Sequence, residues 1–220
     1  MATRQLLTAL TAAHTQNGGP QVQLESVGGV DAARRVRAGE AFDFVCLASD
    51  ALQRLVEEGW VSAPSCAGLV HSDVALAVRA GAPRADVGSE AALRALVLQS
   101  PSIGYSTGPS GTALLALIAR WGLTEALQGR LQQAPPGVPV GSMVANGTVA
   151  LGFQQLSELM HLPGLELLGT LPAPVQIRTT FSLGACTRSA QADAVRTMLD
   201  FMNAPWADSV KRAHGMEPIA

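Results

Sequence analysis

Apolar runs typical of strands alternate with helical patterns along almost the whole chain, and this alternation limits the fold more than any other feature. Strand patterns occupy residues 22–27, 42–48, 74–78, 102–105, 148–153, 165–168 and 177–183. Helical patterns occupy residues 3–15, 32–38, 50–58, 89–98, 109–121, 140–145, 154–160, 191–202 and 206–213. Repeated strand–helix units predict an α/β fold with mostly parallel sheets.

Composition excludes several classes of protein. Of the 220 residues 48% are hydrophobic and 15% charged, which excludes a disordered chain. The net charge is −2 and Lys211 is the only lysine, so neither nucleic acid nor an anionic membrane is expected as a partner. No apolar run approaches the roughly 20 residues that cross a bilayer. The first residues show no charged region followed by an apolar one, so we expect no signal peptide at Met1.

The segment from Tyr105 to Thr112 is the strongest indication of a ligand site. It follows a short strand, contains Gly108, Pro109 and Gly111, and leads directly into an apolar helix. Pro109 suits the first helical position, where its missing N–H has no intrahelical partner. Free N–H groups and a partial positive charge at a helix start attract anions. The hydroxyl-rich turn therefore predicts an oxyanion or carboxylate site, although an ordinary helix cap gives the same pattern.

Two further strand-to-helix turns share this composition. Gly28-Gly29-Val30-Asp31 begins one helix, with Asp31 as its expected cap, and Ala48-Ser49-Asp50 begins another. In open α/β sheets ligands bind beyond the carboxyl ends of the strands, so several such turns can serve one ligand. The alternative is that Ser and Asp only cap helices there, each contributing ~1 kcal/mol.

The order of these motifs resembles the molybdate-binding-protein-like branch of the type II periplasmic solute-binding proteins. The resemblance covers nearly the whole chain. It is carried by segments at Ser26–Gly29, Gly39–Val45, Leu52–Val61, Tyr105–Gly111, Asn146–Phe153 and Thr197–Met216. It implies two Rossmann-like lobes, residues 1–73 plus 179–220 and residues 74–178, joined by a two-strand hinge at 74–78 and 175–181. The resemblance also implies that the lobes close over the ligand by a hinge motion.

Two departures from the family pattern bear on the ligand and on assembly. The family has a strand and a Ser-containing loop before the first helix, whereas Met1 here arrives at the helix itself. We expect either a longer precursor, a substitute loop formed by Ala2-Thr3-Arg4, or a homodimer in which a second copy supplies the strand. In addition, Asp31 places a carboxylate in a turn that binds oxyanions in the family. This carboxylate would repel molybdate and favours an organic ligand.

The predicted ligand-binding residues are those that offer hydroxyl, amide or guanidinium donors at these turns. They are Thr3, Arg4, Gly28, Gly29, Val30, Ser106, Thr107, Ser110, Gly111, Thr112, Gln154, Gln155, Ser157 and Arg178. The two glutamines and Ser157 are expected to follow the strand that ends at Phe153, although surface glutamine is common. Arg178 lies near the expected hinge, where a guanidinium could grip a carboxylate, or it is simply exposed.

Three functions fit these observations. The first is a periplasmic receptor that presents a small anion, preferably an organic carboxylate, to an ABC-type transporter permease. The second is an isomerase of a di- or tricarboxylate, because relatives in the resembled branch include aconitate isomerases; its candidate bases are Asp31, Glu158 and His71. The third is a cytoplasmic ligand sensor, if Met1 is the true start.

No enzyme motif decides between these functions. Gly-x-Ser-x-Gly, Gly-x-Gly-x-x-Gly and the phosphate-loop lysine pattern are absent. Neither the four histidines nor the three cysteines have metal-ligand spacing, so no metal and no cofactor are expected. Cys46 is expected in an apolar strand and Cys66 in an exposed loop.

Overall fold

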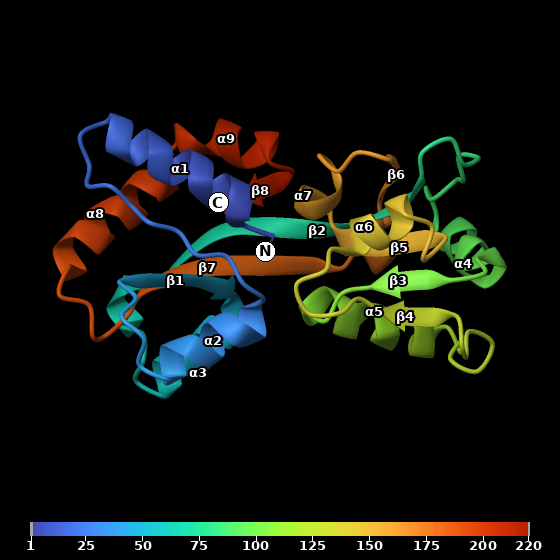
Figure 1. The fold of residues 1–220 in the computed structure, drawn as a ribbon, viewed down its shortest axis with the longest axis horizontal. Helices are drawn as coiled ribbons and strands as arrows, with labels where there is room; N and C mark the ends of the chain where they lie inside the picture. The colour runs from blue at the N-terminus through green and yellow to red at the C-terminus, as the bar shows by residue number, and fades with distance from the viewer. Residues whose placement is uncertain (1, 220) are drawn as a thin grey trace. The chain divides into compact units, whose positions relative to one another are not determined.

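The computed structural model describes residues 2–219, and they divide into two compact units. Unit 1 contains the residues before Asp73 and those after Arg178, and unit 2 is Asp73–Arg178. The chain passes between the units within β2 (Ala67–Arg79) and at the start of β7 (Arg178–Ala185) (Figure 1). Each unit combines helices with strands, which confirms the predicted α/β class.

The helices and strands of each unit are as follows. Unit 1 contains α1 (Arg4–Gln16), α2 (Gly29–Arg37), β1 (Phe44–Ala48), α3 (Ser49–Glu57), α8 (Ala192–Asn203), α9 (Ala207–Ala213) and β8 (Met216–Pro218), with a 3-10 turn at Ala63–Ser65. Unit 2 contains α4 (Glu90–Gln99), β3 (Ile103–Tyr105), α5 (Pro109–Arg120), β4 (Leu131–Gln133), α6 (Val140–Ala145), β5 (Leu151–Gln155), α7 (Leu156–Leu159) and β6 (Leu165–Thr170), with a 3-10 turn at Ala173–Val175.

In unit 1 the sheet separates two hydrophobic clusters. β1 pairs antiparallel with β7, and β8 pairs antiparallel with β2. Successive side chains of a strand point to opposite faces. Phe44 and Cys46 accordingly pack in the cluster that contains α1 and α8, whereas Val45 and Leu47 pack in the cluster that contains α2 and α3. Figure 1 shows these two groups of helices on the two sides of the sheet.

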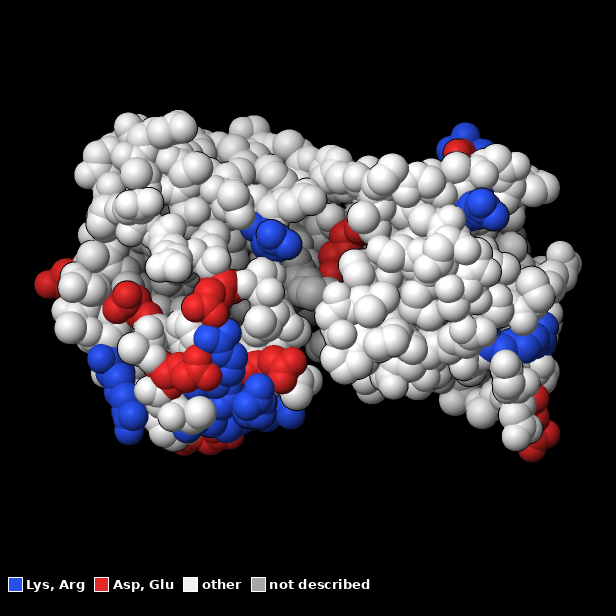
Figure 2. Space-filling model, in the orientation of Figure 1, with Lys and Arg blue, Asp and Glu red and all other residues white. Residues whose placement is uncertain are grey.

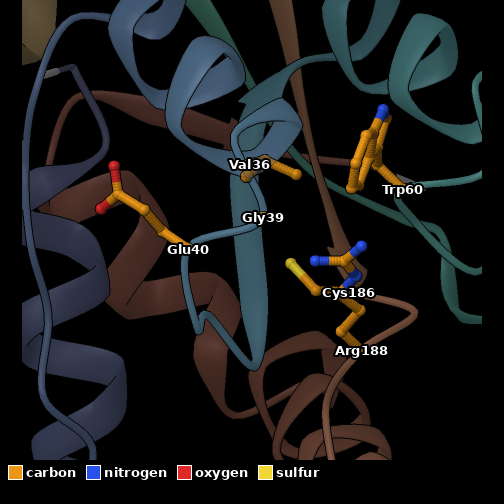
Figure 3. Close-up of a pocket in the computed structure, with 6 residues that line it drawn as sticks. All are labelled: Val36, Gly39, Glu40, Trp60, Cys186 and Arg188. Carbon is orange, nitrogen blue, oxygen red and sulfur yellow. The ribbon is translucent and has the colours of Figure 1, made fainter.

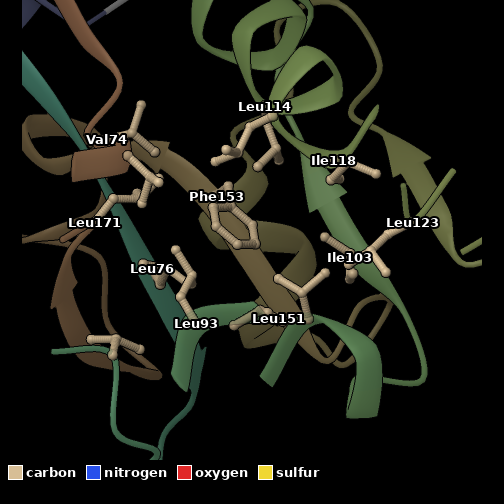
Figure 4. Close-up of a cluster of buried hydrophobic side chains, with 14 of the residues drawn as sticks. Val74, Leu76, Leu93, Ile103, Leu114, Ile118, Leu123, Leu151, Phe153 and Leu171 are labelled. Atoms are coloured by element: carbon tan, nitrogen blue, oxygen red, sulfur yellow. The ribbon is translucent and has the colours of Figure 1, made fainter. Parts of the chain in front are cut away.

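In unit 2 the sheet is mixed. β3 pairs parallel with β4 and with β5, whereas β2 pairs antiparallel with β5 and β6. α4 and α5 cover the larger cluster, in which Phe153 lies among Leu76, Leu114 and Leu151 (Figure 4). α6 and α7 contribute to smaller clusters with Val149 and with two alanines of β2.

Most helices lie where their periodicity predicts them. α1 buries Leu6, Leu7, Leu10 and His14, which recur on one helix face, and the chain leaves the helix at Gly18 with a φ of 87°. The Oγ of Ser89 accepts the N–H of Ala92 at 3.2 Å and caps α4 as expected. Local sequence therefore fixes these helix starts and stops.

The strand predicted at residues 22–27 is wrong. The segment is irregular from residue 19 to residue 28, although Val22 and Leu24 still pack against the unit 1 core. Its alternating pattern is present, but none of the strand pairs found among residues 2–219 includes it. A period of two predicts which side chains are covered, but a strand also needs a paired backbone.

Three further element boundaries differ from prediction. α2 begins at Gly29, so Asp31 lies in the first helical turn instead of capping the helix. α3 has no side-chain cap, and Asp50 instead pairs with Arg54 at 2.7 Å. The strand expected at 148–153 is β5, which runs to Gln155.

Charged side chains gather over α2 and α3 of unit 1, where both signs alternate (Figure 2). Arg35 pairs with Glu25 at 2.7 Å and with Glu40 at 2.6 Å, and Arg37 pairs with Glu58 at 2.6 Å. These positive charges have acidic partners beside them, so this face is not a basic patch of the kind that binds nucleic acid.

Candidate anion-binding site

The carboxyl ends of three parallel strands meet at one edge of the unit 2 sheet. β3 runs parallel to β4 and β5, and Tyr105 lies opposite Gln133 and Phe153. The turn into α5 follows β3, and α7 follows β5. Ligands of open α/β sheets bind at such an edge. Most of the predicted ligand residues of unit 2 therefore come from neighbouring segments.

The turn between β3 and α5 has the geometry of a tight helix start. Gly108 is the N-cap residue and Pro109 is the first helical residue. The hydroxyls of Ser106 and Ser110 are hydrogen bonded at 2.9 Å, and Ser110 is buried. Pro109 has no N–H and the N–H of Gly111 donates to the carbonyl of Gly108 at 3.0 Å, so the N–H of Ser110 is the first-turn donor that an anion could use.

Gly111 is required by close packing at this turn. A Cβ built on Gly111 would lie 1.9 Å from the carbonyl oxygen of Ser106 and 3.2 Å from a ring carbon of Tyr105. The other two predicted residues of this segment, Thr107 and Thr112, are exposed. The structure thus brings Ser106, Ser110 and Gly111 into direct contact and leaves the threonines at the surface.

Gln154 and Gln155 lie inside β5 and not after it, which corrects the expectation that they follow the strand. Both side chains are buried, and so is Ser157 at the start of α7. The Oε1 of Gln154 accepts the N–H of Gly141 at 3.0 Å, in the first turn of α6. These glutamines are strand residues because β5 has side chains packed on both of its faces.

Glu158 lies on α7 next to this buried amide. Its side chain is hydrogen bonded to the side chain of Gln154, and burial raises the pKa of Glu158 above its usual range. The contact with Gln154 lowers the pKa of Glu158 and so opposes the effect of burial, as expected when the amide nitrogen donates to the carboxylate. The unit 2 edge therefore combines hydroxyls, helix-start amides and one carboxyl group.

In unit 1 the predicted residues lie at two helix starts. Gly28 is the N-cap residue of α2, and Val30 in its first turn is 77% exposed. Thr3 is the buried N-cap residue of α1 and is hydrogen bonded to the thiol of Cys46, whereas Arg4 is exposed.

A polar cluster in unit 1 was not predicted as a site. The Oγ of Ser49, at the start of α3, is 2.6 Å from the Oγ of Ser182 and donates to the carbonyl of Thr180 at 3.1 Å. The Nδ1 of His71 is 3.0 Å from the hydroxyl of Thr180. The turn at Ala48-Ser49-Asp50 is one of those that could serve a ligand, but Ser49 is not among the predicted ligand-binding residues, because its contacts with β7 come from residues more than 130 positions away.

Arg178 and Asp31 both have charged partners. The Nε of Arg178 donates to Asp73 at 2.7 Å, and a second guanidinium nitrogen donates to the other carboxylate oxygen at 2.8 Å. Asp31 pairs with Arg34 at 3.3 Å on the exposed side of α2. Arg178 is the last residue of unit 2, and two of its donors are used in this bidentate contact with Asp73.

Two hollows of unit 1 lie apart from the turn between β3 and α5. A crevice of about 10 Å³ in unit 1 is lined by Trp60, Cys186 and Arg188, among others, and contains none of the predicted residues (Figure 3). Its size suits one water molecule. A more open hollow of about 500 Å³ lies along α1 and includes Arg4.

Two searches of residues 2–219 gave negative results. No three His, Cys, Asp or Glu side chains among them are placed to hold a metal ion. None of the helices formed by these residues has the length and apolar character of a membrane span.

Comparison with solved structures defines the class of fold. The periplasmic molybdate-binding protein of Azotobacter vinelandii matches with a TM-score of 0.81 and 18% identity, over 99% of this chain and 96% of that chain. The sulfate-binding protein SubI of Mycobacterium tuberculosis matches with a TM-score of 0.77 and 17% identity, over 99% and 83%. The fold is that of a type II periplasmic binding protein, as the resemblance in sequence implied.

Comparison of sequences gives the family. The model for bacterial extracellular solute-binding proteins matches residues 1–217, and the chain belongs to this family. An aconitate isomerase from a Pseudomonas species is 32% identical over 84% of this chain and 71% of its own length. The molybdate-binding protein ModA of Azotobacter vinelandii is 28% identical over 50% of this chain and 44% of its own length.

Proposed function

We propose that the protein binds a small organic carboxylate in the periplasm and presents it to the permease of an ABC-type transporter. The observation that carries this proposal is the turn between β3 and α5. Its two hydroxyls, its close-packed glycine and its helix start lie at the carboxyl edge of parallel strands. Family membership supports solute binding, and the chemistry of this turn supports an anion.

Asp31, which was expected to repel molybdate, is exposed and paired with Arg34 at 3.3 Å, so its charge does not distinguish the two classes of ligand. The comparisons of sequence favour an organic anion over molybdate. The relative named for aconitate, a tricarboxylate, shares 32% identity over 84% of this chain, whereas the molybdate-binding relative matches over 50%. A carboxylate ligand also suits uncharged donors such as serine hydroxyls and amides.

We propose a set of ligand-binding residues for each unit by itself, and we propose the two strands that pass between the units as the hinge. The set in unit 2 is Ser106, Thr107, Ser110, Gly111, Thr112, Gln154, Gln155, Ser157 and Arg178. The set in unit 1 is Thr3, Arg4, Gly28, Gly29 and Val30. Ser49, with its contact to Ser182, is added to the unit 1 set by its position at the start of α3.

Thermal-shift measurements test the proposed ligand class. The panel contains citrate, cis- and trans-aconitate, other di- and tricarboxylates, molybdate, tungstate and sulfate. A ligand at 100 times its dissociation constant adds about 2.7 kcal/mol to the free energy of unfolding. We expect a carboxylate to raise the melting temperature. A shift with molybdate or tungstate alone would refute the organic ligand.

Variants then test the turn itself. Ser110→Ala is expected to reduce the ligand-induced shift, because it removes a donor at the start of α5. Thr124→Ala is a matched control, since Thr124 is exposed and lies after the other end of the same helix. If Ser110→Ala keeps the full shift, the turn does not contact the ligand.

A second candidate function is isomerisation of a di- or tricarboxylate, favoured by the 32% identity with an aconitate isomerase. Moving a double bond in such a substrate needs one placed base beside an anion site. Of the three candidate bases, Asp31 is exposed and ion paired, His71 contacts Thr180, and Glu158 is partly buried. Following cis- and trans-aconitate by proton NMR in the presence of the protein tests this function. No interconversion would exclude aconitate isomerisation.

We also propose that two copies of this chain form a homodimer. Among residues 2–219, β1 has β7 as its only strand partner, so no other strand of this part of the chain is paired with its second edge. An open strand edge is a template for pairing with another chain. We expect light scattering to show a dimer whose formation is lost with Cys46→Pro, because proline at this edge removes a backbone donor. A monomer at all concentrations would contradict the dimer.

A further inference from the structure

We propose that Asn146, in the turn between α6 and β5, is a site of spontaneous deamidation, in which the backbone nitrogen of Gly147 attacks the Asn146 side chain. The nitrogen of Gly147 loses its proton to solvent and bonds to Cγ of Asn146. The bond from Cγ to Nδ2 breaks, and Nδ2 takes up a proton and leaves as ammonia. Water then opens the cyclic imide at either of its carbonyl carbons, so the products are aspartate and isoaspartate at position 146. The inference does not depend on the proposed ligand.

The chain contains two Asn-Gly pairs, and their backbones have nearly the same conformation. Asn17 is the C-cap residue of α1 with φ −90° and ψ 19°, and Asn146 is the C-cap residue of α6 with φ −86° and ψ −2°. The glycines that follow have φ values of 87° and 81°. In each pair the glycine N–H donates to the carbonyl three residues before it, at 3.1 Å after Asn17 and at 3.0 Å after Asn146. Any difference in reactivity therefore comes from the surroundings of the two side-chain amides.

The amide of Asn146 is turned toward the nitrogen that attacks it. Its Oδ1 accepts the N–H of Thr148, two residues on, at 2.9 Å. This hydrogen bond closes a small ring that contains both Cγ and the glycine nitrogen, so the reacting atoms are held close together. The amide of Asn17 is turned the other way, because its Nδ2 donates to the carbonyl of Ala13, four residues back, at 2.9 Å. That contact draws the side chain back along α1 and away from the next residue.

The Oδ1 of Asn146 also faces donors at the point where negative charge develops. In addition to its backbone N–H, Thr148 donates its hydroxyl to this oxygen at 2.7 Å. The oxygen becomes negative when the glycine nitrogen bonds to Cγ, and donors that already face it stabilise the charge without reorganisation. Within residues 2–219, the side-chain oxygen of Asn17 accepts no hydrogen bond. The two donors therefore lower the barrier at one asparagine and not at the other.

A cation lies beside the same turn. One guanidinium nitrogen of Arg79, the last residue of β2, is 3.8 Å from the position that a Cβ on Gly147 would occupy. Arg79 is exposed, and it takes part in none of the ion pairs formed within residues 2–219. Its charge favours loss of the neighbouring amide proton and the negative charge of the product. A Cβ on Gly18 would have none of the described atoms within 4 Å.

Both products change the turn that leads into β5. Aspartate adds a negative charge close to Arg79, whereas isoaspartate carries the main chain through its side-chain carbon and lengthens it. The turn is fixed by the N–H of Val149, which donates to the carbonyl of Met143 at 3.2 Å. A longer main chain disturbs this hydrogen bond. The isoaspartate form is therefore expected to unfold more readily than the original protein.

Mass spectrometry of the unmodified whole protein tests the inference. The protein is incubated at mildly alkaline pH and digested at intervals, and an isoaspartyl methyltransferase labels the isoaspartate product. In the folded protein we expect position 146 to convert roughly tenfold faster than position 17, because two donors and the direction of the amide differ. In urea both pairs lose their surroundings and should convert at similar rates. A folded protein in which Asn17 converts as fast as Asn146 would overturn the inference.

Variants then test the groups around the amide. Thr148→Val removes the hydroxyl and keeps the backbone N–H, so conversion at position 146 should slow by roughly threefold to tenfold. Thr148→Ser keeps a hydroxyl and should convert like the unmodified protein. Arg79→Gln should also slow the reaction, whereas Arg84→Gln, which changes an exposed arginine of the same unit that is paired with Glu166, should not. An unchanged rate in both Thr148→Val and Arg79→Gln would refute the activation of Asn146 by its neighbours.

Discussion

Replacing Gly111 by alanine should destabilise unit 2, because the added methyl has no space in the turn between β3 and α5. The Cβ would lie 1.9 Å from the carbonyl oxygen of Ser106 and 2.9 Å from its carbonyl carbon. An ordinary non-bonded approach of these atoms is about 3.5 Å, so the backbone must move by more than an ångström. Such overpacking costs about 1–3 kcal/mol.

The matched control is Gly108→Ala in the same turn. A Cβ on Gly108 would meet only the Oγ of Ser106, at 4.0 Å, and the φ of −86° is allowed for alanine. Thermal unfolding followed by circular dichroism compares the two variants. A loss of 1–3 kcal/mol corresponds to roughly 2–12 °C for a chain of this size. We expect Gly111→Ala to melt lower by this amount and Gly108→Ala to stay within about 3 °C of the unmodified protein.

The same comparison bears on the ligand site. The clash pushes the Ser106 carbonyl away from α5, so the hydroxyl contact between Ser106 and Ser110 should open as well. Gly111→Ala should then lose the carboxylate-induced thermal shift that Gly108→Ala retains. Equal melting temperatures for the two variants would refute the packing argument, and equal ligand shifts would refute its connection to binding.

Two further predictions concern buried groups. Gln154→Leu should lower the free energy of unfolding, measured in urea, by about 1–3 kcal/mol, because the buried N–H of Gly141 loses its acceptor. A loss below about 0.5 kcal/mol would contradict the role of this hydrogen bond. A thiol reagent at neutral pH should modify Cys66 first, because Cys66 is exposed, whereas burial raises the pKa of Cys46 and of Cys186 to about 11. Mass spectrometry measures the modification of each cysteine. Fast modification of all three thiols in the folded protein would contradict the burial of Cys46 and Cys186.

Sequence patterns predicted more of the fold than of the site. The helix periodicity of α1 and α6 and the Pro109 start of α5 depend on residues within a few positions, and these predictions are confirmed. The strand expected at residues 22–27 failed because pairing depends on a distant backbone that local alternation does not describe. β4 and β8 were missed because three-residue strands carry too little pattern to detect.

For the candidate site, the sequence predicted which types of residue occupy the turns, but only the fold shows which residues lie next to one another. The glycine- and hydroxyl-rich segment from Tyr105 to Thr112 could be recognised as a helix start before an apolar run. The contact of Ser49 with Ser182, and the engagement of Arg178 by Asp73, join residues more than 100 positions apart. No local pattern predicts such pairs, because they arise from the pairing and crossing of strands.

The sequence by itself determined that this chain is an α/β protein with glycine- and hydroxyl-rich turns at its helix starts, since periodicity, caps and glycine positions act through near neighbours. Only the tertiary structure decided which of these turns share an edge, that Gln154 is buried inside β5, and that Glu158 stands beside it. The physical reason is that burial and charge environment are sums over residues distant in sequence. The pKa of a carboxyl group, unlike the start of a helix, is therefore set by the folded neighbourhood.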